Sequence, residues 1–121
     1  MQIGQIAVSA QDIDRCTTFY RDVVGLEHLF SVPPKMTFFD AGGVRLMFSL
    51  PEGNEHDHPS SILYFKVDDI DATYARMVAG SAEFIETPHI VAPMKDHDLW
   101  IAAFRDGEGN TMALMEERKR V

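Results

Sequence analysis

The sequence repeats a pattern: residues 5–14 are Gln-Ile-Ala-Val-Ser-Ala-Gln-Asp-Ile-Asp, and residues 62–71 are Ile-Leu-Tyr-Phe-Lys-Val-Asp-Asp-Ile-Asp. Each stretch ends on an Asp-Ile-Asp element, at residues 12–14 and 69–71, so the offset between the copies is constant from residue 5 with 62 to residue 14 with 71. Alternating apolar side chains are typical of a half-buried strand, and Asp before a helical apolar pattern is typical of a helix N-cap. The repeat therefore predicts two copies of a strand that leads into a helix.

A second correspondence lies near the end of each half. Gly-Val-Arg-Leu-Met-Phe at residues 43–48 matches Gly-Asn-Thr-Met-Ala-Leu at residues 109–114. The larger separation between these copies means that the second half carries extra residues between its helix and its last strand. We therefore expect one domain over residues 1–121, made of module 1 at about residues 1–55 and module 2 at about residues 60–121.

Each module is predicted to contain a strand, a helix and three further strands, which is an α+β fold of paired βαβββ modules. In module 1 the helix begins at Asp12 and ends at Gly25, and in module 2 it runs over residues 69–79 and ends at Gly80. The predicted strands are residues 3–9, 27–31, 36–40 and 44–50, then 61–67, 84–87, 99–105 and 111–116. Residues 88–98 are expected to form a loop, whose first residues could pair as a strand, and residues 107–110 a hairpin turn.

Strand alternation divides the strand side chains between two faces. An apolar set is expected to pack under the helices: Ile6, Val8, Leu46, Phe48, Leu63, Phe65, Val67, Met112 and Leu114. The other set mixes apolar and polar groups and is expected to line a cleft enclosed by a curved mixed sheet: Gln5, Arg45, Met47, Ile62, Tyr64, Trp100 and Ala113. Arg45 and Lys66 could instead point to solvent at a sheet edge. A cleft of this kind favours a small, partly apolar ligand over a sugar or a nucleotide.

Composition excludes several classes of partner. Eleven Lys and Arg against nineteen Asp and Glu give a net charge of −8, which disfavours binding to nucleic acid or to an anionic membrane surface. No apolar run approaches the roughly 20 residues of a membrane helix, and no basic leader precedes the first strand, so we expect a cytoplasmic protein. The single cysteine, Cys16, cannot form an internal disulfide and is expected to be a small buried side chain of the first helix.

The histidines are the candidates for catalysis. His89 and His97 flank the segment before the predicted strand at residues 99–105, and Asp96 and Asp98 stand on either side of His97. A carboxylate can orient an imidazole and raise its basicity, as a general base requires, although a charged loop tip would look the same. His56 and His58 form a His-x-His pair that could bind a metal or belong to a solvated linker, and His28 is expected to be a partly exposed structural residue.

Three elements in order carry a resemblance to a known family. The opening, with its Asp-Ile-Asp at residues 12–14 and Phe-Tyr-Arg-Asp at 19–22, the copy at residues 67–71, and the closing residues 104–116 are similar to vicinal oxygen chelate proteins. These form the glyoxalase, bleomycin-resistance and extradiol dioxygenase superfamily. The resemblance implies a glyoxalase-like fold, with the helices outside a cleft, and a homodimer.

The resemblance also implies where a metal would be bound. The ligand positions of metal-dependent members correspond to Gln5, Met47, Ile62 and Ala113. Divalent ions are held by imidazole, carboxylate or thiolate groups, and only Gln5 offers even an amide oxygen. Shifting either module by one residue restores no ligand set. We therefore expect neither a metal nor another cofactor.

Three functions remain open on these grounds. The first is a bleomycin-resistance-like protein that binds a small molecule without metal. The second is a lyase, isomerase or dioxygenase-type enzyme that uses His89, His97 and Asp96. The third is a dimeric regulatory or interaction module whose cleft has lost its ligand.

Overall fold

Asp12 and Asp69 each cap the start of an α-helix, as the repeat predicts. In the computed structural model, which describes residues 1–120, the carboxylate of each aspartate accepts a hydrogen bond from a backbone N–H three residues on, from Arg15 and from Ala72, both at 3.0 Å. This contact satisfies a backbone donor that the first helical turn leaves open. The described chain divides into two compact units, residues 1–61 with 107–110, and residues 62–106 with those from 111 onward.

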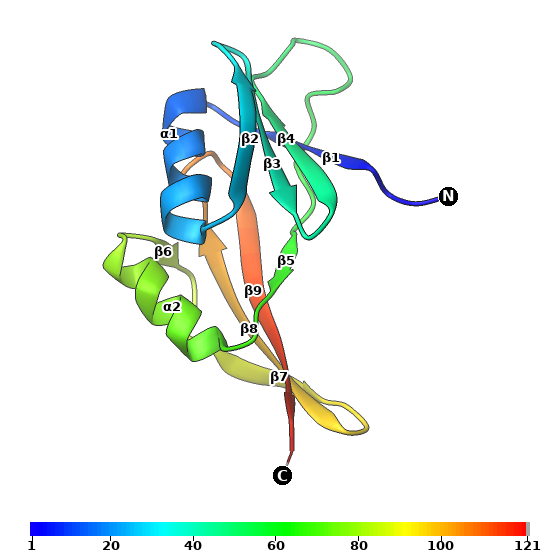
Figure 1. Cartoon of the computed structure of the whole chain (residues 1–121), viewed down its shortest axis with the longest axis vertical. Helices are drawn as coiled ribbons and strands as arrows, with labels where there is room; N and C mark the ends of the chain where they lie inside the picture. Colours follow the sequence, from blue (N-terminus) through cyan, green and yellow to red (C-terminus); the bar gives the residue numbers. More distant parts are fainter. Residues whose placement is uncertain (121) are drawn as a thin grey trace. The chain divides into compact units, whose positions relative to one another are not determined.

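The first unit is a four-stranded mixed sheet with a helix on one face (Figure 1). Its elements are β1 (Gln5–Ser9), α1 (Ile13–Thr18), the π-helical turn η1 (Phe19–Val24), β2 (Glu27–Val32), β3 (Met36–Ala41) and β4 (Val44–Ser49). The strand order is β1-β4-β3-β2, with β1 parallel to β4 and the other neighbours antiparallel.

The second unit repeats this arrangement and adds one strand. Its elements are β5 (Tyr64–Lys66), α2 (Ile70–Ala79), β6 (Glu83–Phe84), β7 (His89–Pro93), β8 (His97–Arg105) and β9 (Thr111–Lys119). The order β5-β9-β8-β6 matches that of the first unit, and β7 pairs separately with β8. These two mixed sheets with few helices confirm the predicted α+β fold class.

Strand register agrees with both sequence correspondences. Ala7 lies opposite Met47 across the parallel pair β1 and β4, and Tyr64 lies opposite Ala113 across the parallel pair β5 and β9. Tyr64 is the copy of Ala7 in the first correspondence, and Ala113 is the copy of Met47 in the second. The extra residues of the second half form β7 and its turn into β8.

Each sheet buries the face that its helix covers. In the first unit the ring of Tyr20, on η1, packs against Phe48 at 4.3 Å and Phe39 at 6.1 Å between centroids, and all three side chains are fully buried. Cys16 is also fully buried on this helical face, which confirms its predicted position. In the second unit Ile70 and Met77 of α2 are fully buried, as are Phe104, Met112 and Leu114 of the strands. Aromatic packing of this kind supplies much of the burial free energy of a small core.

The segment at residues 88–98 is not the predicted loop. Residues 89–93 form β7, and residues 97 and 98 already belong to β8, so that most of the segment is a β-hairpin. Only the open alternative, that its first residues pair as a strand, is correct. The sequence signal was weak because a bulge between Ile90 and Ala92 breaks the alternation of the strand. The strands predicted at residues 61–67 and 84–87 are shorter than expected, at three and two residues.

None of the helices in the described part of the chain has the length and apolar character that crossing a lipid bilayer requires.

Candidate functional site

The face of the first sheet that carries no helix, hereafter the open face, is built in three rows by the strand register. Side chains of directly paired residues lie on the same face, so each row runs across the four strands. The rows, from β1 to β2, are Gln5, Arg45, Asp40 and Glu27; then Ala7, Met47, Phe38 and Phe30; then Ser9, Ser49, Met36 and Val32. The first row is polar, the second is apolar and aromatic, and the third combines hydroxyl groups with apolar side chains.

The polar row holds an arginine in a defined orientation. Arg45 Nε donates to Gln5 Oε1 at 2.7 Å, and its guanidinium lies 5.6 Å from the centroid of the Phe38 ring. Gln5 Nε2 in turn contacts Met47 Sδ at 3.7 Å. Gln5 therefore connects the cation of the first row to the apolar second row.

The second row presents an aromatic surface. Phe30 and Phe38 are stacked, with centroids 4.4 Å apart and planes 22° from parallel. Phe38 is buried, but Phe30 remains 46% exposed on the edge strand β2. A flat apolar surface of this kind suits an aromatic or aliphatic group.

A cavity of about 410 Å³ opens over the second and third rows, and a neighbouring one of about 460 Å³ lies over the start of β3. The first cavity is lined by strand residues and by the segment that follows β4: Ala7, Ser9, Met36, Met47, Ser49, Leu50, Pro51, Glu52, His56, Asp57 and His58. Its size falls in the range of small-molecule sites, and it combines apolar walls with a few polar groups.

Asp57 holds the loop over this cavity together through hydrogen bonds within the loop. Its carboxylate accepts hydrogen bonds from the backbone N–H groups of Glu52, at 2.8 Å, and Gly53, at 2.5 Å. These two donors favour the ionised form and hold the pKa of Asp57 below its usual value. The loop therefore has a specific conformation at neutral pH, although it is exposed.

Both loop histidines use the same ring nitrogen within the loop. His56 Nδ1 lies 3.0 Å from Asn54 Oδ1, and His58 Nδ1 lies 3.0 Å from the carbonyl oxygen of Pro59. An acceptor oxygen on Nδ1 leaves the lone pair of Nε2 available when the ring is neutral. The sequence analysis offered a solvated linker as one interpretation of these two histidines. It did not predict that they line a cavity, because the path of this segment over the sheet was not known.

In the second unit His97 lies between two carboxylates, on the face of the second sheet that carries no helix. Its Nδ1 is 2.7 Å from Asp96 Oδ1, and its Nε2 is 3.8 Å from Glu117 Oε2. Lys66 Nζ reaches the same Glu117 oxygen at 3.6 Å. The hydrogen bond to His97 is the main reason that the pKa of Asp96 is lowered. These groups form a surface network of two carboxylates, an imidazole and an ammonium group.

The structure does not bring His89 to this network. His89 pairs with Ile101 across β7 and β8, four residues along β8 from His97, which corresponds to roughly 13 Å at about 3.3 Å per residue. Its Nδ1 lies 2.9 Å from the Thr87 carbonyl oxygen and its Nε2 lies 3.8 Å from Glu86. Asp98 pairs with Arg120 at 2.7 Å instead of facing a histidine.

The remaining predicted cleft residues of the second unit lie in three environments. Tyr64 and Ile62 are about half exposed, at 50% and 48%, whereas Ala113 is buried. Trp100 pairs with Glu116 and lies under the guanidinium of Arg118 at 4.3 Å, which places it on the same face as the N-terminus of α2. Trp100 is therefore on the opposite face of β8 from Ile101, and the structure does not group it with Tyr64.

The four positions that correspond to the family's metal ligands do not fit a hard cation. Gln5 Oε1 already accepts from a guanidinium, Met47 supplies a thioether, and Ile62 and Ala113 supply no donor. Within residues 1–120, no three or more His, Cys, Asp or Glu side chains form a group that could hold a metal ion. The chemistry of this donor set suits binding by packing and hydrogen bonds.

Met36, Phe30 and Phe38 were missed by the sequence interpretation. The alternation of residues 36, 38 and 40 could have marked the open face of β3, but the partner strands had to be placed in register first. The polar residues Thr37 and Glu108, both buried, were also missed. The partners of Glu108 lie more than 90 residues away in sequence, and those of Thr37 lie on other elements of the first unit.

With this geometry in place, the relationship to known proteins is clear. Residues 2–114 match the Glyoxalase/Bleomycin resistance protein/Dioxygenase superfamily, and the chain belongs to this superfamily. Comparison with proteins of curated function gives no significant match.

Solved structures of the same fold are numerous. A lactoylglutathione lyase from Agrobacterium tumefaciens is 25% identical, with a TM-score of 0.74 over 95% of this chain and 92% of its own. A superfamily member from Sphaerobacter thermophilus is 18% identical, with a TM-score of 0.78 and coverage of 97% and 98%. A family enzyme from Burkholderia phytofirmans is 22% identical, with a TM-score of 0.77 and coverage of 97% and 99%. The last two likenesses concern the fold alone.

Proposed function

We propose that this protein binds a small, partly apolar molecule on the open face of its first unit, without a divalent metal. The observation that carries the proposal is the cavity of about 410 Å³ between the methionine-bearing rows of the sheet and the loop at residues 51–58. Met36 and Met47 provide adaptable apolar contacts, and Ser9, Ser49 and the loop histidines provide polar ones.

The side chains at the four positions that correspond to the family's metal ligands support binding without metal. A bound divalent cation beside Gln5 would stand close to the guanidinium of Arg45, and like charges repel at such distances. Met47, Ile62 and Ala113 supply no hard donor at three of the four corresponding positions. Metal-assisted chemistry at the family's usual place therefore has no support from these residues.

A thermal-shift screen tests the proposal. Small aromatic, thiol and carboxylic compounds are added to the purified protein, with Ni²⁺, Zn²⁺, Mn²⁺ and Fe²⁺ in parallel. A compound that binds only the folded state raises Tm, and one present at 100 times its Kd stabilises by about 2.7 kcal/mol. We expect at least one organic compound, and none of the metals, to give a saturable rise.

A matched pair of variants localises the ligand. Ala7→Phe places a ring on the sheet surface that lines the cavity and is expected to abolish the rise. Ala75→Phe adds the same ring to the exposed surface of α2 and is expected to leave it intact. Either a screen without any saturable organic ligand or a stoichiometric tightly bound metal would contradict the proposal.

A lyase activity is the second candidate, favoured by the 2.7 Å contact between His97 and Asp96 and by the lyase description of the Agrobacterium tumefaciens protein. In this case His97 is the general base, oriented by Asp96, on the open face of the second sheet. An assay with lactoylglutathione tests it. His97→Gln should lower kcat/KM by about 100-fold, whereas His89→Gln, roughly 13 Å away along β8, should not. Absence of turnover in the unaltered protein rejects this candidate.

A further inference from the structure

We infer that Arg45 is the specificity-determining residue of the cavity and that the ligand is a small monocarboxylate with an apolar body. This inference rests on the proposed function and adds the chemical class of the ligand. It is carried by an oriented guanidinium on the open face, which forms no ion pair with a carboxylate among the described residues 1–120.

The orientation of Arg45 comes from two independent contacts. Its Nε donates a hydrogen bond to Gln5 Oε1 at 2.7 Å, and its guanidinium carbon lies over the Phe38 ring, 5.6 Å from the ring centroid. The two terminal NH₂ groups are left to donate elsewhere. A guanidinium held in one plane loses less conformational entropy on binding and can donate two parallel hydrogen bonds to a planar carboxylate.

The charge of Arg45 is available to a ligand. Arg45 takes part in none of the ion pairs with N–O distances up to 4.0 Å in the described residues 1–120. Asp40, its neighbour on β3, instead accepts from the backbone N–H of Gly43 at 3.4 Å in the hairpin turn. Asp40 and Glu27 nevertheless belong to the same row, so their negative charges disfavour a dianion more than a monoanion.

The cation and the cavity are within reach of one small molecule. Arg45 and Met47 are two residues apart on β4 and share a face, which separates their Cα atoms by roughly 7 Å. Gln5 contacts both side chains, and Met47 lines the cavity. A carboxylate at Arg45 would therefore leave its apolar body on Met47 and Met36, with the stacked Phe30 and Phe38 rings alongside.

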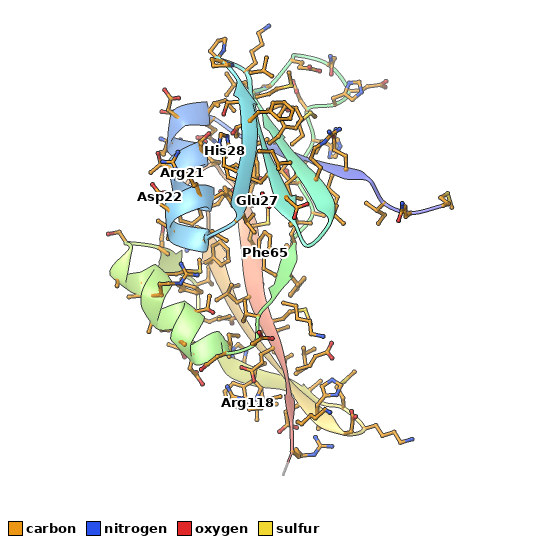
Figure 2. All side chains as sticks on the ribbon, in the orientation of Figure 1. Arg21, Asp22, Glu27, His28, Phe65 and Arg118 are labelled. Carbon is orange, nitrogen blue, oxygen red and sulfur yellow. The ribbon has the colours of Figure 1, made fainter. Side chains whose placement is uncertain are left out.

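The test compares 4-phenylbutanoate with 4-phenylbutanamide, which share the apolar body and differ in the charge of the head. Binding to the full chain is measured by titration calorimetry in the unaltered protein and in Arg45→Gln, Arg21→Gln and His58→Gln. Arg21 is a suitable control because it belongs to the helical layer of the same unit, where Figure 2 labels it beside Asp22. Its guanidinium pairs with the Asp22 carboxylate at 2.8 Å. Removing either arginine changes the net charge equally.

We expect the carboxylate to bind about tenfold more tightly than the amide, because a charge-assisted bond is roughly twice as strong as a neutral one. Arg45→Gln should abolish this preference while amide binding persists, and the other two variants should retain it. Equal affinities in the unaltered protein, or a preference that survives in Arg45→Gln or is lost only in His58→Gln, would overturn the inference.

The two proposals fail in different ways. If neither probe binds but a neutral compound of the thermal-shift screen does, the inference about Arg45 is wrong and the proposed cavity stands. If no compound of the screen binds saturably, both are wrong. Binding of the carboxylate that depends on Arg45 but not on Ala7→Phe would keep the anion site and reject the cavity as its apolar part.

Discussion

Arg15 Nε donates to Glu108 Oε2 at 2.7 Å, and the carboxylate that receives this bond is completely buried although the two residues are 93 positions apart in the chain. The other oxygen of Glu108 accepts from the backbone N–H groups of Gln11 and Asp12 at 2.7 and 2.8 Å. These donors stand at the N-terminus of α1, where negative charge is stabilised by the helix dipole. Within the first unit, Glu108 thus holds the turn at residues 107–110 in place, and Asn110 Nδ2 adds a hydrogen bond to the carbonyl oxygen of Ser9 at 2.7 Å.

Glu108→Gln is expected to destabilise the protein by about 2–4 kcal/mol, since the amide keeps one acceptor but loses the charge that Arg15 and the helix N-terminus require. Urea unfolding followed by circular dichroism measures the loss. Glu55→Gln in the exposed loop is the control and should stay within about 0.5 kcal/mol of the unaltered protein. A Glu108→Gln variant as stable as this control would show that the buried contacts contribute little.

The two helices end differently, and this difference predicts that a Gly→Ala substitution costs stability at one end and almost none at the other. Gly25 has φ 94° and ψ 25°, in the left-handed region, whereas Gly80 has φ −84° and the left-handed residue after α2 is Ser81, with φ 73°. Gly25→Ala should therefore cost about 1 kcal/mol, and Gly80→Ala should be close to neutral. Urea midpoints of the two variants provide the measurement, and equal midpoints would contradict the backbone argument.

Local patterns predicted the elements of the fold but not their long-range partners. The Asp12 and Asp69 caps and the strand alternation are local patterns of nearby residues. Both helices, and most of the strands in their order along the chain, can therefore be predicted from the sequence. The bulge in β7 removes the alternation on which strand prediction depends. His89 and His97 are only eight residues apart in sequence, yet an extended hairpin separates them by roughly 13 Å along β8.

The candidate site was also predictable only in part, because local patterns do not identify long-range partners. Gln5, Arg45 and Met47 were assigned to one face by alternation along their own strands, and the structure places them together. Met36 and Phe38 join them only through the register of β3 with β4, and His56 and His58 only through the path of the loop. Neither register nor loop path is encoded in a local pattern.

The stability of the second unit should depend on pH through Glu116. This nearly buried carboxylate accepts from Arg118 Nε at 2.9 Å and from the Ile70 N–H at 2.9 Å, and the bond from Arg118 is the main cause of its lowered pKa. A carboxyl with a lower pKa in the folded state binds fewer protons there than in the unfolded state. Its stabilising contribution is therefore complete above its ordinary pKa of about 4.5 and is lost as the pH falls through the lower, folded value.

Urea midpoints measured from pH 7 to pH 3 test this dependence in the unaltered protein and in Glu116→Gln. The gap between the two should be widest at neutral pH and should narrow below about pH 4.5, because protonation removes the same charge as the substitution. A gap that is constant over the whole range would mean that the charge of Glu116 is not what Arg118 and Ile70 stabilise.

The last prediction concerns the tautomer of His28, which Figure 2 shows on β2. His28 Nε2 lies 2.9 Å from Ser31 Oγ and 3.1 Å from Thr37 Oγ1, the two hydroxyls are 3.0 Å apart, and Thr37 is 3.0 Å from Thr17. The Thr17 hydroxyl is the donor both to the carbonyl oxygen of Ile13, at 2.7 Å, and to Thr37 Oγ1. Thr37 therefore accepts from Thr17.

Three contacts join His28 Nε2, Ser31 Oγ and Thr37 Oγ1, whereas the two hydroxyls hold only two protons, so we expect His28 Nε2 to carry a third. Nitrogen-15 NMR of the histidine side chains should show His28 protonated at Nε2 in its neutral form, with a slowly exchanging proton because Thr37 is fully buried. Thr37→Val leaves Nε2 with one hydroxyl, which can donate or accept, so the preference for Nε2 should weaken and stability should fall by about 1–3 kcal/mol. A neutral His28 protonated at Nδ1 in the unaltered protein would contradict this proton count.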